Sequence, residues 1–336
     1  MEATISSYLL KGFAQLVAER GGDLAAIAEG SGIGRDAFLA NGMQIPVRQV
    51  LAGFELAARN CDFRGFGLTL AERSSLDVVG PLWPLVNSAG TVRQMLEDLT
   101  ANFHIYADRG IASLVAVEGG AMLHYDIMAG ECESQVQIVE FSLAVVYREI
   151  CRQVEGGTDT AAFLFRHSRP ADLAVHRRVL GPDLRFDQDC NAIFLDSALL
   201  TRSCRLHDPQ GRETATSRVG ELRRDTPHGM ARQVEQVIRT CPNLSDCSIA
   251  EISARLGLST RTVQRALNAE GTSFRRVFDH VRADLAKKYL VQSTLGIGQI
   301  AELLGYSEMS AFSRAFRRWQ SSTATRERMR AQALPS

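Results

Sequence analysis

The sequence lacks several features that mark whole classes of protein. It has no apolar run of the ~18 residues that a membrane-spanning helix needs, and no signal peptide at its start. Its 7 cysteines form no Cys-x-x-Cys pair, and no His, Cys, Asp or Glu residues have the spacing of metal ligands. No Gly-x-Ser-x-Gly or other nucleophile motif is present. These absences predict a cytoplasmic chain without metal, cofactor or catalytic residues.

The cysteines allow two interpretations. With no sign of secretion, all of them are expected to be reduced. Two of them could act as a redox sensor, but buried cysteine more often behaves as a small apolar residue, and we favour that interpretation.

The charge of the chain is balanced overall but unevenly distributed. Its 336 residues, 45% of them hydrophobic, suffice for two domains with separate cores. Residues 227–336 hold 16 Lys and Arg against 9 Asp and Glu, a balance of +7. Since the chain carries 38 of each sign, residues 1–226 hold 22 against 29, a balance of −7. A basic excess at one end indicates a surface for the phosphates of a nucleic acid.

One helix-turn-helix pattern occurs twice in this basic part, over residues 249–259 and again over residues 297–307, at an offset of 48 residues. Each copy has apolar residues at helical spacing, then a glycine, then a serine two positions later. The pairs are Gly257 with Ser259, and Gly305 with Ser307. Glycine ends a helix in the left-handed conformation at low steric cost, and serine can cap the helix that follows. The repetition predicts a duplicated DNA-binding unit.

The second helix of each copy is expected to present a polar face outward. In the first copy, Val263 and Leu267 face inward; in the second, where one extra residue enters, Phe312 and Phe316 do so. The outward residues are then Arg261, Gln264 and Arg265 in the first copy, and Met309, Ser310, Ser313 and Arg314 in the second. Arg can bind guanine and Gln adenine in the major groove, which makes these residues candidate DNA contacts.

The stretch between the two copies predicts one long helix. Residues 273–290 have apolar side chains at steps of three and four. A helix of about 20 residues spans roughly 30 Å, close to one turn of duplex DNA. Such a spacer would let both outward helices enter successive major grooves.

The residues 257–274, 300–307 and 312–319 together resemble the AraC/XylS family of bacterial transcription regulators. The resemblance covers about the last hundred residues. It implies an all-α domain of seven helices with two helix-turn-helix units, and double-stranded DNA as its partner. By motif position it places DNA contacts on the same seven outward residues. After Trp319 the family usually continues with Gly, Ser-Pro, an aromatic and Arg. Here Ser321, Ala324 and Glu327 stand at the Gly, Pro and aromatic positions, and only Arg328 agrees.

The first part of the chain predicts an α+β domain over residues 1–204. Helices are expected over residues 4–20, 23–29, 35–41, 46–60, 91–106, 135–153 and 171–180. Strands are expected over residues 111–118, 121–128, 161–166, 184–187 and 192–195, the first two joined as a hairpin by Gly119-Gly120. The start would thus be all helix, followed by helices that cover a modest antiparallel or mixed sheet.

Residues 205–226 are polar and contain Pro and Gly, which predicts a linker with a short helix over 214–224. Residues 227–336 would then form the DNA-binding domain.

The amino-terminal part is also similar to the effector and dimerisation domain of one AraC subgroup. The similarity lies in residues 163–167, 170–172, 184–186 and 191–196. It implies a small-molecule effector and a homodimer, and a role in activation implies RNA polymerase as a further partner. His104, Tyr106 and His124 lie near predicted strands, and Arg166 could meet a ligand carboxylate, so these four are candidate effector contacts.

Two other kinds of protein also carry DNA-binding domains. A DNA-repair enzyme that accepts a methyl group on cysteine would need a Pro-Cys-His-Arg motif, which the sequence lacks. An architectural DNA-binding protein without a ligand would not need a large apolar amino-terminal domain, but it remains the alternative to a sequence-specific regulator.

Overall fold

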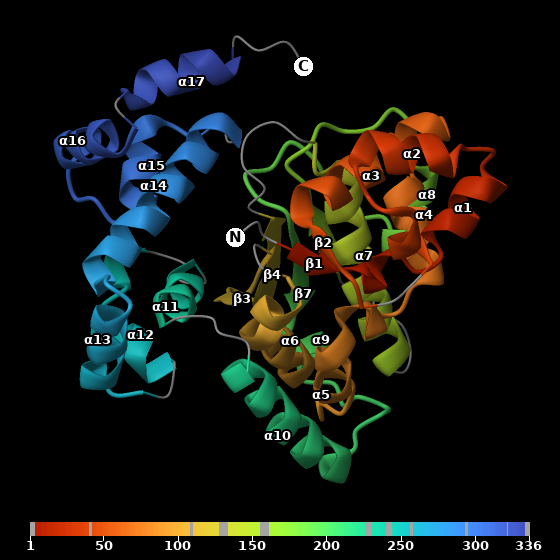
Figure 1. Cartoon of the computed structure of the whole chain (residues 1–336), viewed down its shortest axis with the longest axis horizontal. Helices are drawn as coiled ribbons and strands as arrows, with labels where there is room; N and C mark the ends of the chain where they lie inside the picture. The colour runs from red at the N-terminus through yellow and green to blue at the C-terminus, as the bar shows by residue number, and fades with distance from the viewer. Residues whose placement is uncertain are drawn as a thin grey trace. The chain divides into compact units, whose positions relative to one another are not determined.

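The computed structural model describes residues 4–39, 42–107, 110–127, 134–154, 161–225, 230–239, 244–255, 258–292, 295–320 and 322–332. The chain divides into two compact units, residues 1–226 and 227–336, each with its own hydrophobic core. The predicted fold class is confirmed, because the first unit combines helices with a sheet and the second is helical (Figure 1). No helix in the described ranges is long and apolar enough to cross a membrane.

The first unit begins with a strand. β1 (Thr4–Ser6) pairs antiparallel with β2 (Gln44–Pro46), and a 3-10 turn over Ser7–Leu10 follows β1. α1 (Phe13–Glu19) starts only after Gly12, whose φ of 79° is left-handed and cannot belong to a right-handed helix. The predictions of one helix over residues 4–20 and of an all-helical start are therefore wrong.

Most of the other predicted helices form, and polar side chains cap two of them. The Asp23 carboxylate accepts hydrogen bonds from two backbone N–H groups of α2, and the Thr91 hydroxyl accepts one from α6. The expected helix over residues 35–41 is only a 3-10 turn, Arg35–Phe38. The remaining bounds are α2 (Leu24–Ser31), α3 (Val47–Asn60), α4 (Phe66–Arg73), the 3-10 segment Leu76–Leu82, α5 (Trp83–Asn87), α6 (Val92–Tyr106), α7 (Val136–Gln153), α8 (Ala174–Leu180) and α9 (Ser197–Leu200).

A five-stranded mixed sheet with the order β3-β4-β7-β5-β6 forms the other layer of this unit. The strands are β3 (Gly110–Val117), β4 (Gly120–Ile127), β5 (Ala162–Leu164), β6 (Leu184–Arg185) and β7 (Ala192–Asp196). Only β5 and β6 are parallel. In β4, buried and half-buried residues alternate, so one face of the sheet packs inward against α6 and α7.

The predicted linker contains a longer helix than expected. α10 (Pro209–Asp225) packs against α5 and α6 and contributes Ala215 and Val219 to the core of the first unit. The Arg212 guanidinium also binds the carboxylate of Asp98 on α6, at 2.7 and 3.1 Å. By these contacts most of residues 205–226 belongs to the first unit.

The second unit consists of α11 (Met230–Arg239), a 3-10 turn Leu244–Asp246, α12 (Ile249–Arg255), α13 (Thr260–Ala269), α14 (Phe274–Gln292), α15 (Ile297–Leu303), α16 (Met309–Gln320) and α17 (Ala324–Gln332). α14 runs through this unit and contacts α11, α15, α16 and α17. Although the sequence departs from the family pattern after Trp319, α17 packs on α14 and α16 through buried Ala324. The Arg328 guanidinium donates a hydrogen bond to the carbonyl of Leu295.

The cysteines differ in part from the expectation of a reduced chain. Cys61, Cys151, Cys190 and Cys204 are free thiols, whereas Cys247 is disulfide-bonded. Cys132 and Cys241 lie outside the described residues.

Candidate DNA-binding surface and effector pocket

The first helix-turn-helix unit is formed by α12 and α13. The Ser259 hydroxyl accepts a hydrogen bond from the backbone N–H of Thr262 at 3.1 Å and so caps α13, as the sequence predicted. Val263 and Leu267 are fully buried against the rest of the unit. This burial fixes the rotation of α13 and leaves its other face exposed, with Arg261, Gln264 and Arg265 on it. The predicted turn residue Gly257 lies outside the described residues.

The second unit, α15 and α16, repeats this arrangement with one change. Gly305 has a φ of 73°, and a Cβ there would lie 2.6 Å from the backbone nitrogen of Ser245, so the turn requires glycine. Phe312 and Phe316 are fully buried, and the exposed residues of α16 include Met309, Ser310, Ser313 and Arg314.

The expected capping role of Ser307 is wrong. α16 begins at Met309, and the carbonyl of Glu308 accepts the first helical hydrogen bonds, from the N–H groups of Ala311 and Phe312. The extra residue in the second copy thus separates Ser307 from the helix by one position.

The long helix between the two units also holds the second turn in place. α14 has 19 residues, which corresponds to about 28 Å at the α-helical rise. Its Arg282 lies over the rings of Phe278 and Tyr306, at 4.3 and 4.5 Å from their centroids, and donates to the Gly305 carbonyl at 3.2 Å. Sequence reasoning missed Arg282, since nothing in the local pattern tells this arginine from a solvated one.

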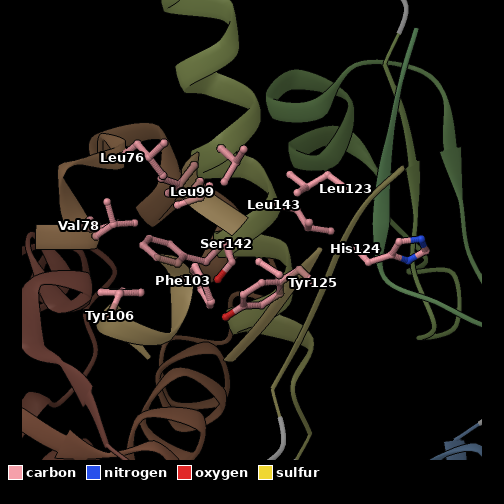
Figure 2. Close-up of a pocket in the computed structure, with 15 residues that line it drawn as sticks. Leu76, Val78, Leu99, Phe103, Tyr106, Leu123, His124, Tyr125, Ser142 and Leu143 are labelled. Atoms are coloured by element: carbon pink, nitrogen blue, oxygen red, sulfur yellow. The ribbon is translucent and has the colours of Figure 1, made fainter. Parts of the chain in front are cut away.

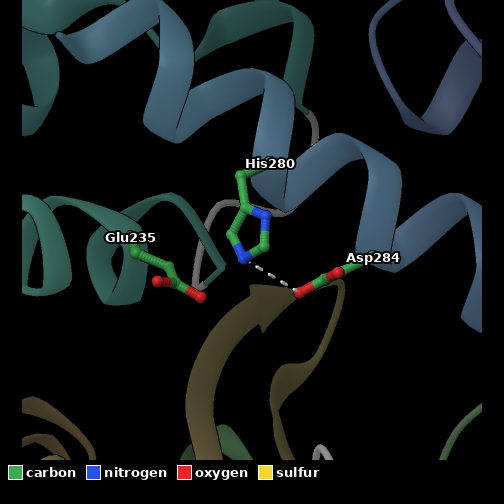
Figure 3. A group of neighbouring side chains, drawn as sticks. All are labelled: Glu235, His280 and Asp284. Carbon is green, nitrogen blue, oxygen red and sulfur yellow. Dashed lines mark ion pairs between the residues drawn. The ribbon is translucent and has the colours of Figure 1, made fainter. Parts of the chain in front are cut away.

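A cluster of possible metal ligands lies on α11 and α14. Oxygen or nitrogen atoms of Glu235, His280 and Asp284 lie within 4.8 Å of one another (Figure 3). The Arg239 guanidinium, however, lies 2.6 Å from the Glu235 carboxylate and 2.7 Å from the Asp284 carboxylate. This buried cation is paired with both carboxylates, so the group is best explained as an ion-pair network that joins α11 to α14.

In the first unit, a pocket lies between α6, α7, the segment Leu76–Leu82 and the β3–β4 hairpin (Figure 2). It is partly open to solvent. Its walls are mostly aliphatic and aromatic, which is typical of sites for small ligands. The lining residues are Leu76, Val78, Val79, Leu99, Phe103, Tyr106, Ala112, Leu123, His124, Tyr125, Phe141, Ser142, Leu143, Val145 and Val146.

The four candidate effector contacts are placed differently around this pocket. Tyr106 and His124 line it, although His124 follows buried Leu123 on β4 and its ring points away from the other lining side chains (Figure 2). Arg166 does not line it, because its guanidinium binds the Asp126 carboxylate at 2.6 Å and the Asp189 carbonyl at 2.8 Å. The side chain of His104 lies outside the described part of the structure. Most of the pocket was missed because apolar lining residues resemble core residues in a sequence.

Next to the pocket, α7 carries a buried carboxylate. The Glu140 Oε1 atom lies 2.7 Å from Nε2 of His176 and 3.2 Å from Nε2 of His167, and Glu140 is completely buried. Burial alone would raise the pKa of Glu140, but the two histidines outweigh it and hold the pKa below its usual value. The network joins α7 to α8 and to the residues that follow β5.

Comparisons with known proteins identify both units. Residues 21–204 match the model of the arabinose-binding domain of AraC transcription regulators, and residues 252–330 match a helix-turn-helix domain model. The chain is 30% identical over 277 residues to the HTH-type transcriptional regulator VirS of Mycobacterium tuberculosis, covering 80% of this chain and 81% of that protein. It is 27% identical over 271 residues to the ornithine utilization regulator of Pseudomonas aeruginosa, covering 77% of each chain. The crystal structure of the transcriptional regulator CdpR from Pseudomonas aeruginosa aligns with a TM-score of 0.38 and 22% identity, covering 78% of this chain and 86% of that one.

The first of these domain models alone covers more than half of the chain, and the relatives span most of its length. Their identity as regulators agrees with the prediction that the chain is not an enzyme. The helix-turn-helix units of residues 249–316 and the preceding α/β domain thus make this chain a member of the AraC family of DNA-binding transcription regulators.

Proposed function

We propose that this regulator is a cytoplasmic, homodimeric activator of transcription that inserts α13 and α16 into successive major grooves of its operator. The observation that carries this proposal is that each helix buries one apolar stripe and exposes the residues expected to contact DNA. α14 spans about 28 Å, close to the 34 Å of one duplex turn.

The proposed contacts differ in chemistry between the two helices. α13 offers Arg261, Gln264 and Arg265, which can hydrogen-bond to base edges. α16 offers Arg314 together with Met309, Ser310 and Ser313, of which Met309 can make apolar contact with a thymine methyl group. Discrimination between bases would therefore be stronger at the half-site bound by α13.

We further propose that a small molecule bound by the first unit controls DNA binding. A ligand that prefers one of two arrangements of the DNA-binding units shifts the population towards it. The apolar pocket against α6 and α7 supports such a role, since sites for small molecules are usually concave and lined mainly by apolar side chains. In an activator, the favoured arrangement would recruit RNA polymerase.

Genome-wide DNA capture by the purified full-length protein, at one stated salt concentration, tests this proposal. A reproducible motif with two-part half-sites is the expected result, and the genes beside it would indicate the regulated pathway. Binding without any motif would overturn the proposal and indicate an architectural DNA-binding protein. The exposed arginines would then contact phosphates and not base edges.

The homodimer is tested separately by sedimentation of the full chain without DNA. We expect a dimer at micromolar concentration, and a monomer at that concentration would contradict the proposed assembly.

A further inference from the structure

The pocket of the first unit contains no charged group that faces a ligand. Among the described residues, no Lys, Arg, Asp or Glu side chain lines it. The nearest charges on β4 are on the other face of the strand, because residues alternate between faces and Asp126 follows buried Tyr125. Asp126 is also paired with Arg166 at 2.6 Å. A carboxylate or ammonium group in the pocket would lose its hydration without gaining a counter-charge.

The hydrogen-bonding groups that face the pocket are hydroxyls. Tyr125 shares a hydrogen bond with Ser142, and the rings of Tyr106 and Tyr125 both lie edge-on to Phe103, with centroids 5.6 and 5.9 Å from it. Figure 2 shows Phe103, Tyr125 and Ser142 in the middle of the lining side chains. For the Tyr106 hydroxyl, no hydrogen-bond partner is found among the residues that the structure describes.

Both phenols are neutral in this environment. Burial raises the pKa of Tyr106 and that of Tyr125 far above the usual value of a tyrosine. A neutral phenol can donate a hydrogen bond and accept one, so it can bind a carbonyl, ester, ether or hydroxyl group of a ligand.

From these observations we propose that the pocket takes an uncharged, largely apolar molecule with one hydrogen-bonding group, and that Tyr106 binds this group. The inference rests on the proposed effector role of the first unit and specifies the ligand class for it. A free amino acid would place several charges in a pocket that neutralises none.

Direct binding to the full-length protein at pH 7.5, by isothermal titration calorimetry, tests the proposal with four one-ring probes. They are methyl phenylacetate, the phenylacetate anion, the phenethylammonium cation and ethylbenzene. We expect the neutral ester to bind roughly 100-fold more tightly than either ion, because only the ions lose charge hydration. Ethylbenzene is expected to bind more weakly than the ester, since it cannot use the Tyr106 hydroxyl.

Two variants assign the binding to this pocket. Tyr106→Phe removes only the hydroxyl and is expected to weaken the ester about tenfold while leaving ethylbenzene unchanged. Tyr147→Phe is the matched control, because Tyr147 is a buried tyrosine on α7 that packs on Phe163 and does not line the pocket. It should leave the affinity of all four probes unchanged.

Three results would overturn the proposal: tighter binding of either ion than of the ester, equal loss of ester affinity in both tyrosine variants, or no binding of any probe up to its solubility limit. The effect of the ester on operator binding is measured separately. An ester that binds but never changes operator affinity would leave the ligand class standing and contradict the regulatory role instead.

Discussion

The two units of this regulator carry their candidate sites in opposite ways. In the second unit, the residues expected to contact DNA are exposed on α13 and α16, and the helices are held by a small core beneath them. In the first unit, the candidate site is a hollow inside the core, between α6, α7 and the sheet. A surface site depends mainly on which way a helix is rotated, whereas an interior site depends on how several elements pack at once.

The two helix-turn-helix units also differ from each other. The first has a serine cap directly before its recognition helix, while in the second one extra residue separates Ser307 from α16. The turn of the second unit is held instead by Arg282 on α14, which contacts the Tyr306 ring and donates a hydrogen bond to the Gly305 carbonyl. The same architecture is therefore stabilised by different interactions in its two copies.

The first prediction, which has the largest expected effect, tests whether the two cores unfold independently. Phe316→Ala removes a fully buried ring from the core of the second unit and should destabilise that unit by about 3–5 kcal/mol. Urea unfolding followed by circular dichroism should show a shifted transition for the second unit and an unchanged one for the first.

Phe163→Ala, in the core of the first unit, is the reciprocal variant and should show the opposite pattern. A single transition that shifts equally in both variants would contradict the division into two independent cores.

The second prediction concerns the buried carboxylate of the first unit. Because the pKa of Glu140 is lowered in the folded state, its contribution to stability is present above the unfolded pKa of 4.5 and is lost as the pH falls through the folded value. Glu140→Gln should cost about 1.5–3 kcal/mol at pH 7, the range for a hydrogen bond to a charged group.

As the pH falls below 5, the variant should also lose less stability than the wild-type chain. The wild-type Glu140 carboxylate takes up a proton in this range, whereas the glutamine of the variant does not. Urea unfolding of both proteins across this pH range measures the difference. If the free energy of unfolding fell equally in both proteins as the pH decreased, Glu140 would not have the proposed role.

The third prediction tests the exposed face of α13. Arg265→Ala should weaken binding to the specific operator by about 1–3 kcal/mol, the value of one good base contact, and relax the preference at one base pair. Fluorescence anisotropy with the operator and with single-base variants measures both effects at one salt concentration.

Arg330→Ala is the matched control, since Arg330 is an exposed arginine near the end of α17, outside the proposed contacts. If Arg265→Ala weakened binding to all DNA sequences by the same factor, Arg265 would be a phosphate contact and not a base contact.

The fourth prediction, which has the smallest expected effect, compares the serines of the two turns. Ser259→Ala removes a helix cap and should destabilise the second unit by about 1 kcal/mol. Ser307→Ala should change the stability by no more than a few tenths of a kcal/mol, because Ser307 is exposed and does not adjoin α16. Equal losses in thermal unfolding would indicate that Ser307 also caps its helix.

The duplicated framework and the outward faces of α13 and α16 could be predicted from the sequence, because apolar residues at helical spacing define one buried stripe whatever the helix packs against. The hairpin β3–β4 and the long helix α7 could also be predicted, because their patterns are local in the sequence.

Contacts between distant residues could not be predicted in this way. β1 forms only because residues 44–46 pair with it. Arg282 packs on the ring of Tyr306, 24 positions later in the chain, and Arg166 forms an ion pair with Asp126 instead of facing the pocket. The pocket depended most on tertiary structure, since Leu99, Leu123 and Leu143 look like core residues in the sequence and only the packing of α6, α7 and β4 leaves space between them.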